Sequence, residues 1–272
     1  MKGNRLFSRR FGYMLIFPSA IVFLIVSIYP LLTGIMLSFQ NSSLYKGDEK
    51  KFVGLKNIIT ILTSDAEFRS DLLFTVIYTI GIVVIAYITG LVFSLLLNTD
   101  VPCRTLFRVL ILIPWVISPA VSSMSWSWLL SDQYGFFNNF LKSIGVIDKS
   151  ILFLADKTLA KIMVIIIGAW RNFPFITVSL LAGLQGISKD YYEAADIDGA
   201  NKFQRFRYVT FPHLKNVSII TITLVSIWTF NNFDNIYMLT KGGPAQSTEV
   251  LSILAYNNAF FRASGSVPKR AT

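Results

Sequence analysis

Long runs of apolar residues constrain this chain more than any other feature of its sequence. The first run extends from Phe11 to about Phe39, contains no charged residue, and follows a basic segment at residues 1–10. A secretory signal peptide begins similarly, but its apolar core is only about 7 to 15 residues long, whereas a membrane span needs roughly 20. We therefore expect a transmembrane helix here, interrupted or kinked at Pro18 and Pro30.

Four further runs have the length of a span, and they cover about residues 72–97, 109–130, 162–184 and 217–239. The chain is 53% hydrophobic and only 15% charged, with a mean hydropathy of +0.57, which is too apolar for a soluble domain with a hydrated surface. The sequence predicts an all-α fold, a polytopic membrane helix bundle of about five spans. Thr75, Gly81, Gly90 and Ser94 supply small or hydroxyl positions for contacts between the helices.

The polar segment between the last two runs predicts a helix, a sharp turn and a second helix. Asp190 and Glu193 have the spacing of a capping box, which places a helix start there. Gly199 can adopt positive φ, so the first helix can stop at this residue and a second can begin near Asn201. Tyr191, Tyr192, Phe203 and Phe206 are aromatic residues of the kind that anchor protein interfaces, which favours a segment that docks onto another protein. The alternative is an amphipathic helix that lies on the membrane surface.

This segment resembles the cytoplasmic "EAA" loop of permease subunits in binding-protein-dependent ABC importers. The residues that carry the resemblance are Glu193, Ala194, Ala195, Asp198, Gly199, Ala200, Phe206 and Phe211-Pro212. The resemblance extends over nearly the whole chain. It also covers residues 52–57, 112–115 with Trp128, 181–185, 240–245 and 247–249. The segments at 52–57 and 240–245 resemble most the carbohydrate-importing branch, in particular the maltose-type F or glycerol-phosphate-type A permease.

The resemblance implies a set of partners and a mechanism. Residues 186–216 would form a coupling loop that inserts into a groove on a dimer of ATP-binding subunits. The other implied partners are a second permease subunit, an extracytoplasmic solute-binding protein, a sugar or polyol substrate and membrane lipid. Residues 11–262 would form the permease domain and work by alternating access.

The location that we expect is the cell (inner or plasma) membrane, with several crossings. Counts of Lys and Arg do not decide the orientation, because both sides have similar totals. The uncompensated basic segment 1–10 directly before the first span favours a cytoplasmic N-terminus. Five crossings then place residues 185–216 in the cytoplasm as well.

Polar residues inside the apolar runs are the candidates for a solute pathway. A charge at the bilayer centre costs about 2.5–3.5 kcal/mol on insertion scales, so it normally faces a cavity or a partner. We assign to a pathway the residues Arg171, Asn231, Asn232, Asp234 and Asn235, with Trp126 or Trp128. Amides and carboxylates can bind sugar hydroxyls, and aromatic faces can stack on sugar rings. The alternative is that Arg171 and Asp234 pair with each other or extend toward the interface.

No motif in the sequence predicts an enzyme, a metal site or a bound cofactor. A phosphate-binding G-x-x-x-x-G-K-[ST] loop is absent, so ATP must be hydrolysed on a separate chain. The single histidine, His213, is more consistent with an interfacial side chain than with a ligand, and Cys103 is the only cysteine. The net charge of +10 is scattered between apolar runs, which argues against nucleic acid as a partner.

Two other functions remain open from the sequence alone. An ion-coupled secondary transporter would need buried carboxylates, and Asp234 is the only acid within a predicted span. A non-transporting membrane scaffold would use the loop only to recruit a cytoplasmic protein.

The end of the chain departs from the family. Such permeases continue into another span, but only residues 262–272 follow Phe261, and 11 residues reach at most about 17 Å as a helix. We therefore expect that the family's last span is missing, that residues 263–272 form an atypical short tail, and that the sequence is truncated or frame-shifted near Arg262.

Overall fold

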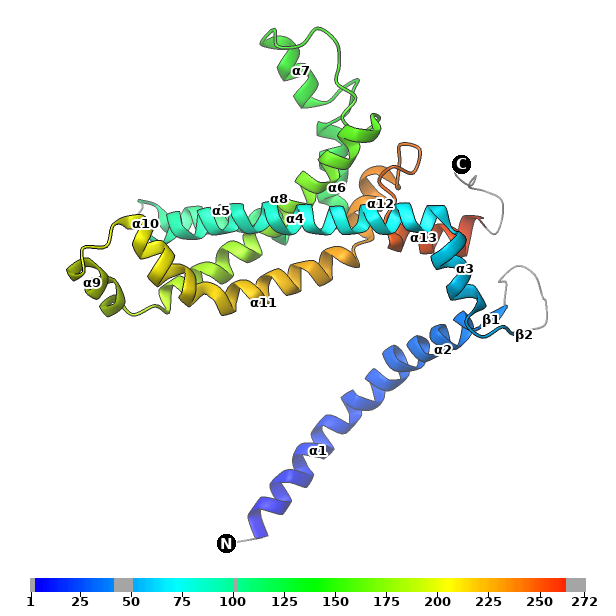
Figure 1. Cartoon of the computed structure of the whole chain (residues 1–272), viewed down its shortest axis with the longest axis horizontal. Helices are drawn as coiled ribbons and strands as arrows, with labels where there is room; N and C mark the ends of the chain where they lie inside the picture. The colour runs from blue at the N-terminus through cyan, green and yellow to red at the C-terminus, as the bar shows by residue number, and fades with distance from the viewer. Residues whose placement is uncertain (1–2, 42–50, 100–101, 263–272) are drawn as a thin grey trace. The chain divides into compact units, whose positions relative to one another are not determined.

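The computed structural model describes residues 3–41, 51–99 and 102–262 (Figure 1). The expected tail at 263–272 lies outside the described residues. The described part of the chain divides at residue 68: one unit contains the residues up to Phe68 together with the segment that begins at Ala259, and the other contains Arg69–Asn258.

The first unit is a long apolar helix followed by a small hairpin and a short helix. Its elements are α1 (Gly3–Phe23), a π-helical turn (Leu24–Ile28), α2 (Tyr29–Ser38), strands β1 (Gln40–Asn41) and β2 (Lys51–Phe52), and α3 (Lys56–Ser64). The strands pair antiparallel, with Gln40 opposite Phe52. Pro18 lies inside α1 without ending the helix. The π-helical turn comes directly before the first turn of α2, which contains Pro30, a residue without a backbone N–H donor. The helical stretch Phe11–Ser38 is long and apolar enough to cross a membrane, as expected for the first span.

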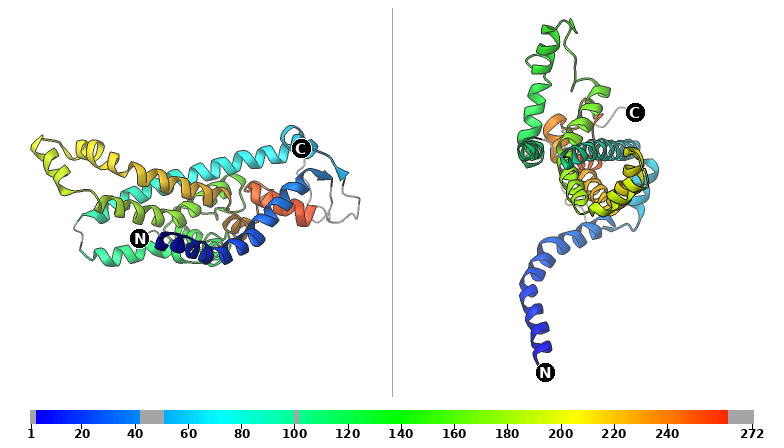
Figure 2. Two further views of the ribbon diagram at one scale, coloured as in Figure 1. Left: turned by 90° about the horizontal axis from the view of Figure 1, so that it is seen from below. Right: turned by 90° about the vertical axis from the view of Figure 1, so that its left-hand side faces the viewer.

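The second unit contains the remaining helices. They are α4 (Ala66–Asn98), α5 (Arg104–Val116), α6 (Pro119–Leu129), α7 (Phe136–Ser143), α8 (Lys157–Gln185), α9 (Lys189–Ile197), α10 (Lys202–Arg205), a π-helical turn (Phe206–Thr210), α11 (Phe211–Phe230), α12 (Asp234–Thr240) and α13 (Leu251–Asn257). A further π-helical turn (Asn258–Arg262) follows in the sequence and belongs to the first unit from Ala259 on. Figures 1 and 2 show α4, α8 and α11 side by side, with α9 and α10 beyond one end.

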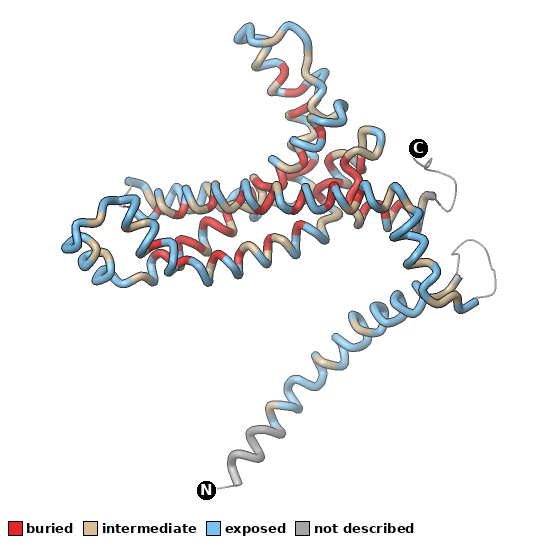
Figure 3. Tube along the Cα trace, in the orientation of Figure 1, coloured by how far each residue is buried: buried red, intermediate tan, exposed pale blue. Residues whose placement is uncertain are grey.

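The core lies between these three long helices, where small residues let the backbones approach. Figure 3 shows the buried residues along the facing sides of α4, α8 and α11. A Cβ atom on Gly90 of α4 would lie 2.9 Å from the Cβ atom of Ile176 and 3.2 Å from the carbonyl oxygen of Phe173, both on α8. Thr75 and Ser94 are buried on α4, and a Cβ on Gly81 would lie 2.9 Å from Ile165. The expected small contact positions are thus confirmed.

The third expected span is not one straight helix. The pair α5 and α6 bends by 93° at residues 117–118. Ser118 is extended because the following Pro119 disfavours helical dihedral angles, and Pro119 is then well placed in the first turn of α6. Four helices of the described residues are long and apolar enough to cross a membrane, and the count is five if this bent pair is one span.

The fifth span is shorter than expected at its C-terminal end. The helix ends at Phe230 instead of continuing to Leu239, because the two following asparagines compete for backbone groups. The amide of Asn231 donates to the carbonyl oxygen of Ile227 at 2.8 Å, and the side-chain oxygen of Asn232 accepts from the N–H of Asn235 at 3.2 Å. Asp234 therefore lies in the first turn of the separate helix α12 and not inside a span.

The close contact at Gly90 gives a test of the core. Gly90→Ala should lower the free energy of unfolding by about 1–3 kcal/mol, because the buried Ile176 and the Phe173 backbone must shift. Gly34→Ala on α2 is the matched control, since nothing lies within 4 Å of its added Cβ. Thermal unfolding of both variants in the same detergent measures the difference. Equal stability would mean that α4 and α8 do not need this small position.

Candidate functional site

Two parts of the second unit carry the residues assigned from the sequence. One is the docking loop, which we define as residues 186–216. The other is the polar pocket, a cavity of about 350 Å³ at the breaks between helices.

The docking loop has the predicted form of a helix, a turn and a second helix. Gly199 has φ of +72°, the N–H of Ala200 donates to the carbonyl oxygen of Ala195 at 2.9 Å, and the N–H of Gly199 donates to that of Asp196 at 3.1 Å. These bonds form a Schellman motif, in which the residue at the left-handed position terminates the helix. The expected stop at Gly199 is confirmed.

The predicted capping box at Asp190 is wrong. Helix α9 begins at Lys189, and its N-cap is Ser188, two residues before Asp190. The Ser188 hydroxyl accepts from the N–H of Asp190 at 3.3 Å. The capping box of this loop belongs to the second helix, where the side chains of Asn201 and Gln204 each accept from the other's backbone N–H. The second helix therefore starts at the expected position.

Polar and aromatic contacts join the two helices of the docking loop to each other and to α11. Arg205 Nη1 lies 2.7 Å from Asp196 Oδ1, and the Arg205 guanidinium covers the ring of Tyr192. The hydroxyl groups of Tyr192 and Thr210 share a 3.1 Å hydrogen bond, and the rings of Tyr191 and His213 lie 4.8 Å apart. Exposed ion pairs contribute little individually, at most about 1 kcal/mol, so the loop depends on several contacts together.

The outer surface of the docking loop is partly apolar. Ile197 is 87% exposed and Phe203 is 74% exposed, although both are large hydrophobic residues. Of the four expected aromatic anchors, Tyr191 and Phe203 are exposed, whereas Tyr192 and Phe206 are half-buried. Glu193, Ala194, Asp198 and Pro212 are also exposed, and Ala195 and Ala200 are half-buried. Sequence reasoning missed Ile197, because one apolar residue in a polar helix gives no periodic signal.

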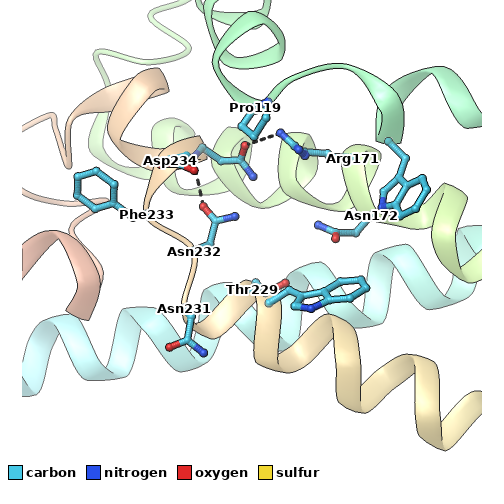
Figure 4. A pocket seen from close by; sticks show the side chains of 11 residues that line it. Pro119, Arg171, Asn172, Thr229, Asn231, Asn232, Phe233 and Asp234 are labelled. Carbon is cyan, nitrogen blue, oxygen red and sulfur yellow. Dashed lines mark hydrogen bonds between the residues drawn. The ribbon is translucent and has the colours of Figure 1, made fainter. Parts of the chain in front are cut away.

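The polar pocket brings together five of the residues assigned to a pathway. Arg171, Asn231, Asn232, Asp234 and Asn235 all line it (Figure 4). Arg171 Nη1 donates to the side-chain oxygen of Asn235 at 3.1 Å, so among the described residues its hydrogen bond is to an amide and not to Asp234. This bond uses one of the five guanidinium N–H donors, and the others can bind a solute.

The aromatic wall of the pocket differs from the expected one. Trp115 and Trp228 line the pocket, and both pack on Phe175, with ring centroids 6.0 Å and 5.0 Å away. Trp126 is instead half-buried and packs against Trp170 and Phe137, and Trp128 is exposed on α6. The 93° bend explains the difference, because it points α6 away from the line of α5. Asn172 and Thr229 are further polar lining residues that the sequence analysis did not select.

Comparisons with known proteins agree on the kind of chain this is. The family model described as "Binding-protein-dependent transport system inner membrane component" matches residues 70–264. The trehalose/maltose transport system permease protein MalF of Thermococcus litoralis is 37% identical over 248 residues, which cover 91% of this chain and 83% of that protein. The trehalose transport system permease protein SugA of Mycobacterium tuberculosis is 32% identical, with 95% and 81% covered.

A solved structure has the same fold. A chain of a bacterial ABC transporter that imports the acidic polysaccharide alginate superposes with a TM-score of 0.79 at 20% identity, covering 95% of this chain and 88% of that one.

The turn at Gly199 gives a test of the docking loop. A side chain there would meet nothing within 4 Å, so only the positive φ opposes substitution, at a cost of about 1–3 kcal/mol for most residues. Gly199→Val should weaken retention of an ATP-binding subunit, the partner that the sequence resemblance implies, in purified complexes, while Gly199→Asn, which tolerates this conformation, should retain it. Equal retention by both variants would show that the shape of the turn does not matter.

Proposed function

The chain belongs to the family of inner membrane components of binding-protein-dependent transport systems, and we propose that it is the permease subunit of an ATP-driven importer for a sugar or related polyol. The polar pocket carries this proposal. Four asparagine amides line it together with one guanidinium and one carboxylate, and it lies between membrane helices beside two tryptophans.

The chemistry of the pocket suits a polyhydroxylated solute. Asn231, Asn232 and Asn172 supply amide donors and acceptors for hydroxyl groups, and the indole rings of Trp115 and Trp228 can lie against a sugar ring. A volume of about 350 Å³ is at the lower end of ordinary ligand pockets, which run from about 300 to 1,000 Å³. The relatives named for trehalose and maltose transport support this substrate class.

We assign the energy source to a separate chain. In this proposal the docking loop inserts into an ATP-binding subunit dimer, with Glu193, the small residues around it and the exposed Ile197 and Phe203 at the contact. This chain then binds no cofactor itself. A second permease subunit and an extracytoplasmic binding protein complete the assembly, and ATP-driven closure would switch the pocket between the two faces of the membrane.

The rival functions make different demands on the same residues. An ion-coupled transporter would rely on Asp234, the one carboxylate that lines the pocket among the described residues, and uptake would then stop with an uncoupler even when ATP is present. A scaffold would show no uptake at all.

The pocket can be tested through its second asparagine and its acid. Asn232→Leu and Asp234→Leu should each reduce uptake about tenfold or more at normal assembly, because each removes a hydrogen-bonding partner of the solute. Asn232→Asp keeps the acceptor for the N–H of Asn235, so it separates the structural role from solute binding. Asn139→Leu, on the exposed face of α7, is the control. Reduced assembly with normal transport per complex would assign the residues a structural role only.

The orientation that we propose has a cytoplasmic N-terminus, on the same side as the docking loop. A reporter fused after Ser188 should be cytoplasmic, and one fused after Gly54 should be external. Reversed labelling in a protease-protection or reporter-activity assay would contradict both the orientation and the docking role of the loop.

A further inference from the structure

Two arginines occupy one face of α5 near its N-terminal end, away from the polar pocket. Arg104 and Arg108 lie one helical turn apart and are half-buried. With the amide of Gln185 oriented to satisfy its hydrogen bonds, its oxygen accepts from Arg108 Nη2 at 2.8 Å and from Arg104 Nη2 at 3.2 Å. Gln185 is the last residue of α8, so both guanidinium groups lie where that helix joins the docking loop.

The two guanidinium groups keep unused hydrogen-bonding capacity. The Nε atoms of Arg104 and Arg108 are shielded from solvent and have no partner among the described residues. Among the described residues, which leave out 100–101, no carboxylate lies within ion-pair distance of either arginine. Two positive charges with free N–H donors suit a compact anion with several oxygens, because a guanidinium can bind phosphate in a bidentate way.

An apolar groove begins beside these arginines. Its volume is about 460 Å³, and its walls include Phe93 and Leu97 of α4, Phe107 and Ile111 of α5, and Trp170 and Phe173 of α8. A smaller cavity of about 220 Å³, lined by Arg108 and Gln185, has Leu97 and Ile111 as walls as well. The cationic end and the apolar groove are therefore adjacent.

The dimensions of this arrangement match one leaflet of a bilayer. Arg104 and Pro114, which lies at the far end of the groove, are ten residues apart on α5. Ten residues of α-helix rise about 15 Å, which is half of a hydrocarbon core of roughly 30 Å. A ligand that fits both parts has an anionic head and an apolar tail about as long as one leaflet is thick.

We propose that this groove binds one anionic phospholipid, with its phosphate on Arg104 and Arg108 and an acyl chain between α4, α5 and α8. A helix of another subunit is the alternative occupant, but it would have to bring a carboxylate to two guanidinium groups, whereas a phospholipid carries its anion at the required end. The lipid would contact Gln185 at the base of the docking loop. This site is independent of which solute the chain transports.

Lipid retention measured by native mass spectrometry tests the proposal. The 272-residue chain, extracted from membranes with the subunits it retains, is titrated with phosphatidylglycerol or phosphatidylcholine of the same acyl composition. We expect it to bind phosphatidylglycerol about tenfold more tightly, as hydrogen bonds to charged groups allow. The double variant Arg104→Gln/Arg108→Gln should lose this preference, and Arg104→Lys/Arg108→Lys should retain part of it.

Matched variants separate the site from general charge and from folding. Lys149→Gln/Lys157→Gln removes two exposed charges outside the docking loop and should leave the preference unchanged. Ile111→Trp fills the groove and should weaken binding of both lipids while the arginines stay intact. This variant still tests the groove if the double glutamine variant does not fold. The proposal is overturned if the glutamine variant keeps the wild-type preference, or if inorganic phosphate alone displaces the lipid. It is also overturned if Leu110→Cys cross-links to another subunit instead of to a cysteine-reactive lipid.

Discussion

Hydrogen bonding of the backbone in a medium without water is the constraint on which the rest of this structure depends. Inside hydrocarbon every N–H and C=O group needs a protein partner, so the chain can leave the helical state only where other parts of the protein or a polar cavity receive the freed groups. The described membrane helices break at two places, residues 117–118 between α5 and α6 and residues 231–233 between α11 and α12. Trp115, Pro119 and residues 231–235 from both breaks line the same polar pocket.

The two breaks support each other through direct contacts. The hydroxyl of Ser123 on α6 donates to the carbonyl oxygen of Asn235 at 3.3 Å, and the hydroxyl of Ser252 on α13 donates to that of Asn232 at 2.8 Å. The carbonyl group of Asn232, which lies in the irregular backbone, is thus bonded by a hydroxyl group of a neighbouring helix, and a second hydroxyl joins α6 to the first turn of α12. The solute site that we propose is therefore placed where the membrane already forces polar groups to gather.

The spans were predictable from the sequence, but the breaks were not. A run of apolar residues gives the length of a crossing and contains no information on its straightness, so the bend at Ser118-Pro119 and the stop at Asn231 were both missed. The missed bend also explains why Trp126 and Trp128 were chosen in place of Trp115 and Trp228, since all four lie in apolar runs. In the docking loop, Gly199 was found because positive φ has a sequence signature, whereas Ser188 was missed because Asp190 and Glu193 offered a competing cap two residues later.

The two helices that join the docking loop also carry walls of the pocket. Helix α8 supplies Arg171 and Asn172 and ends at Gln185, and the helical segment that begins at Lys202 continues through its π-helical turn to Phe230, next to Asn231. A helical segment of 29 residues is about 44 Å long, so each of the two segments reaches from the loop to a wall of the pocket, and a displacement imposed on the loop would act on both walls. If ATP-driven motion acts on this loop as we propose, the coupling needs no separate relay, because the same two helical segments join the loop to the pocket.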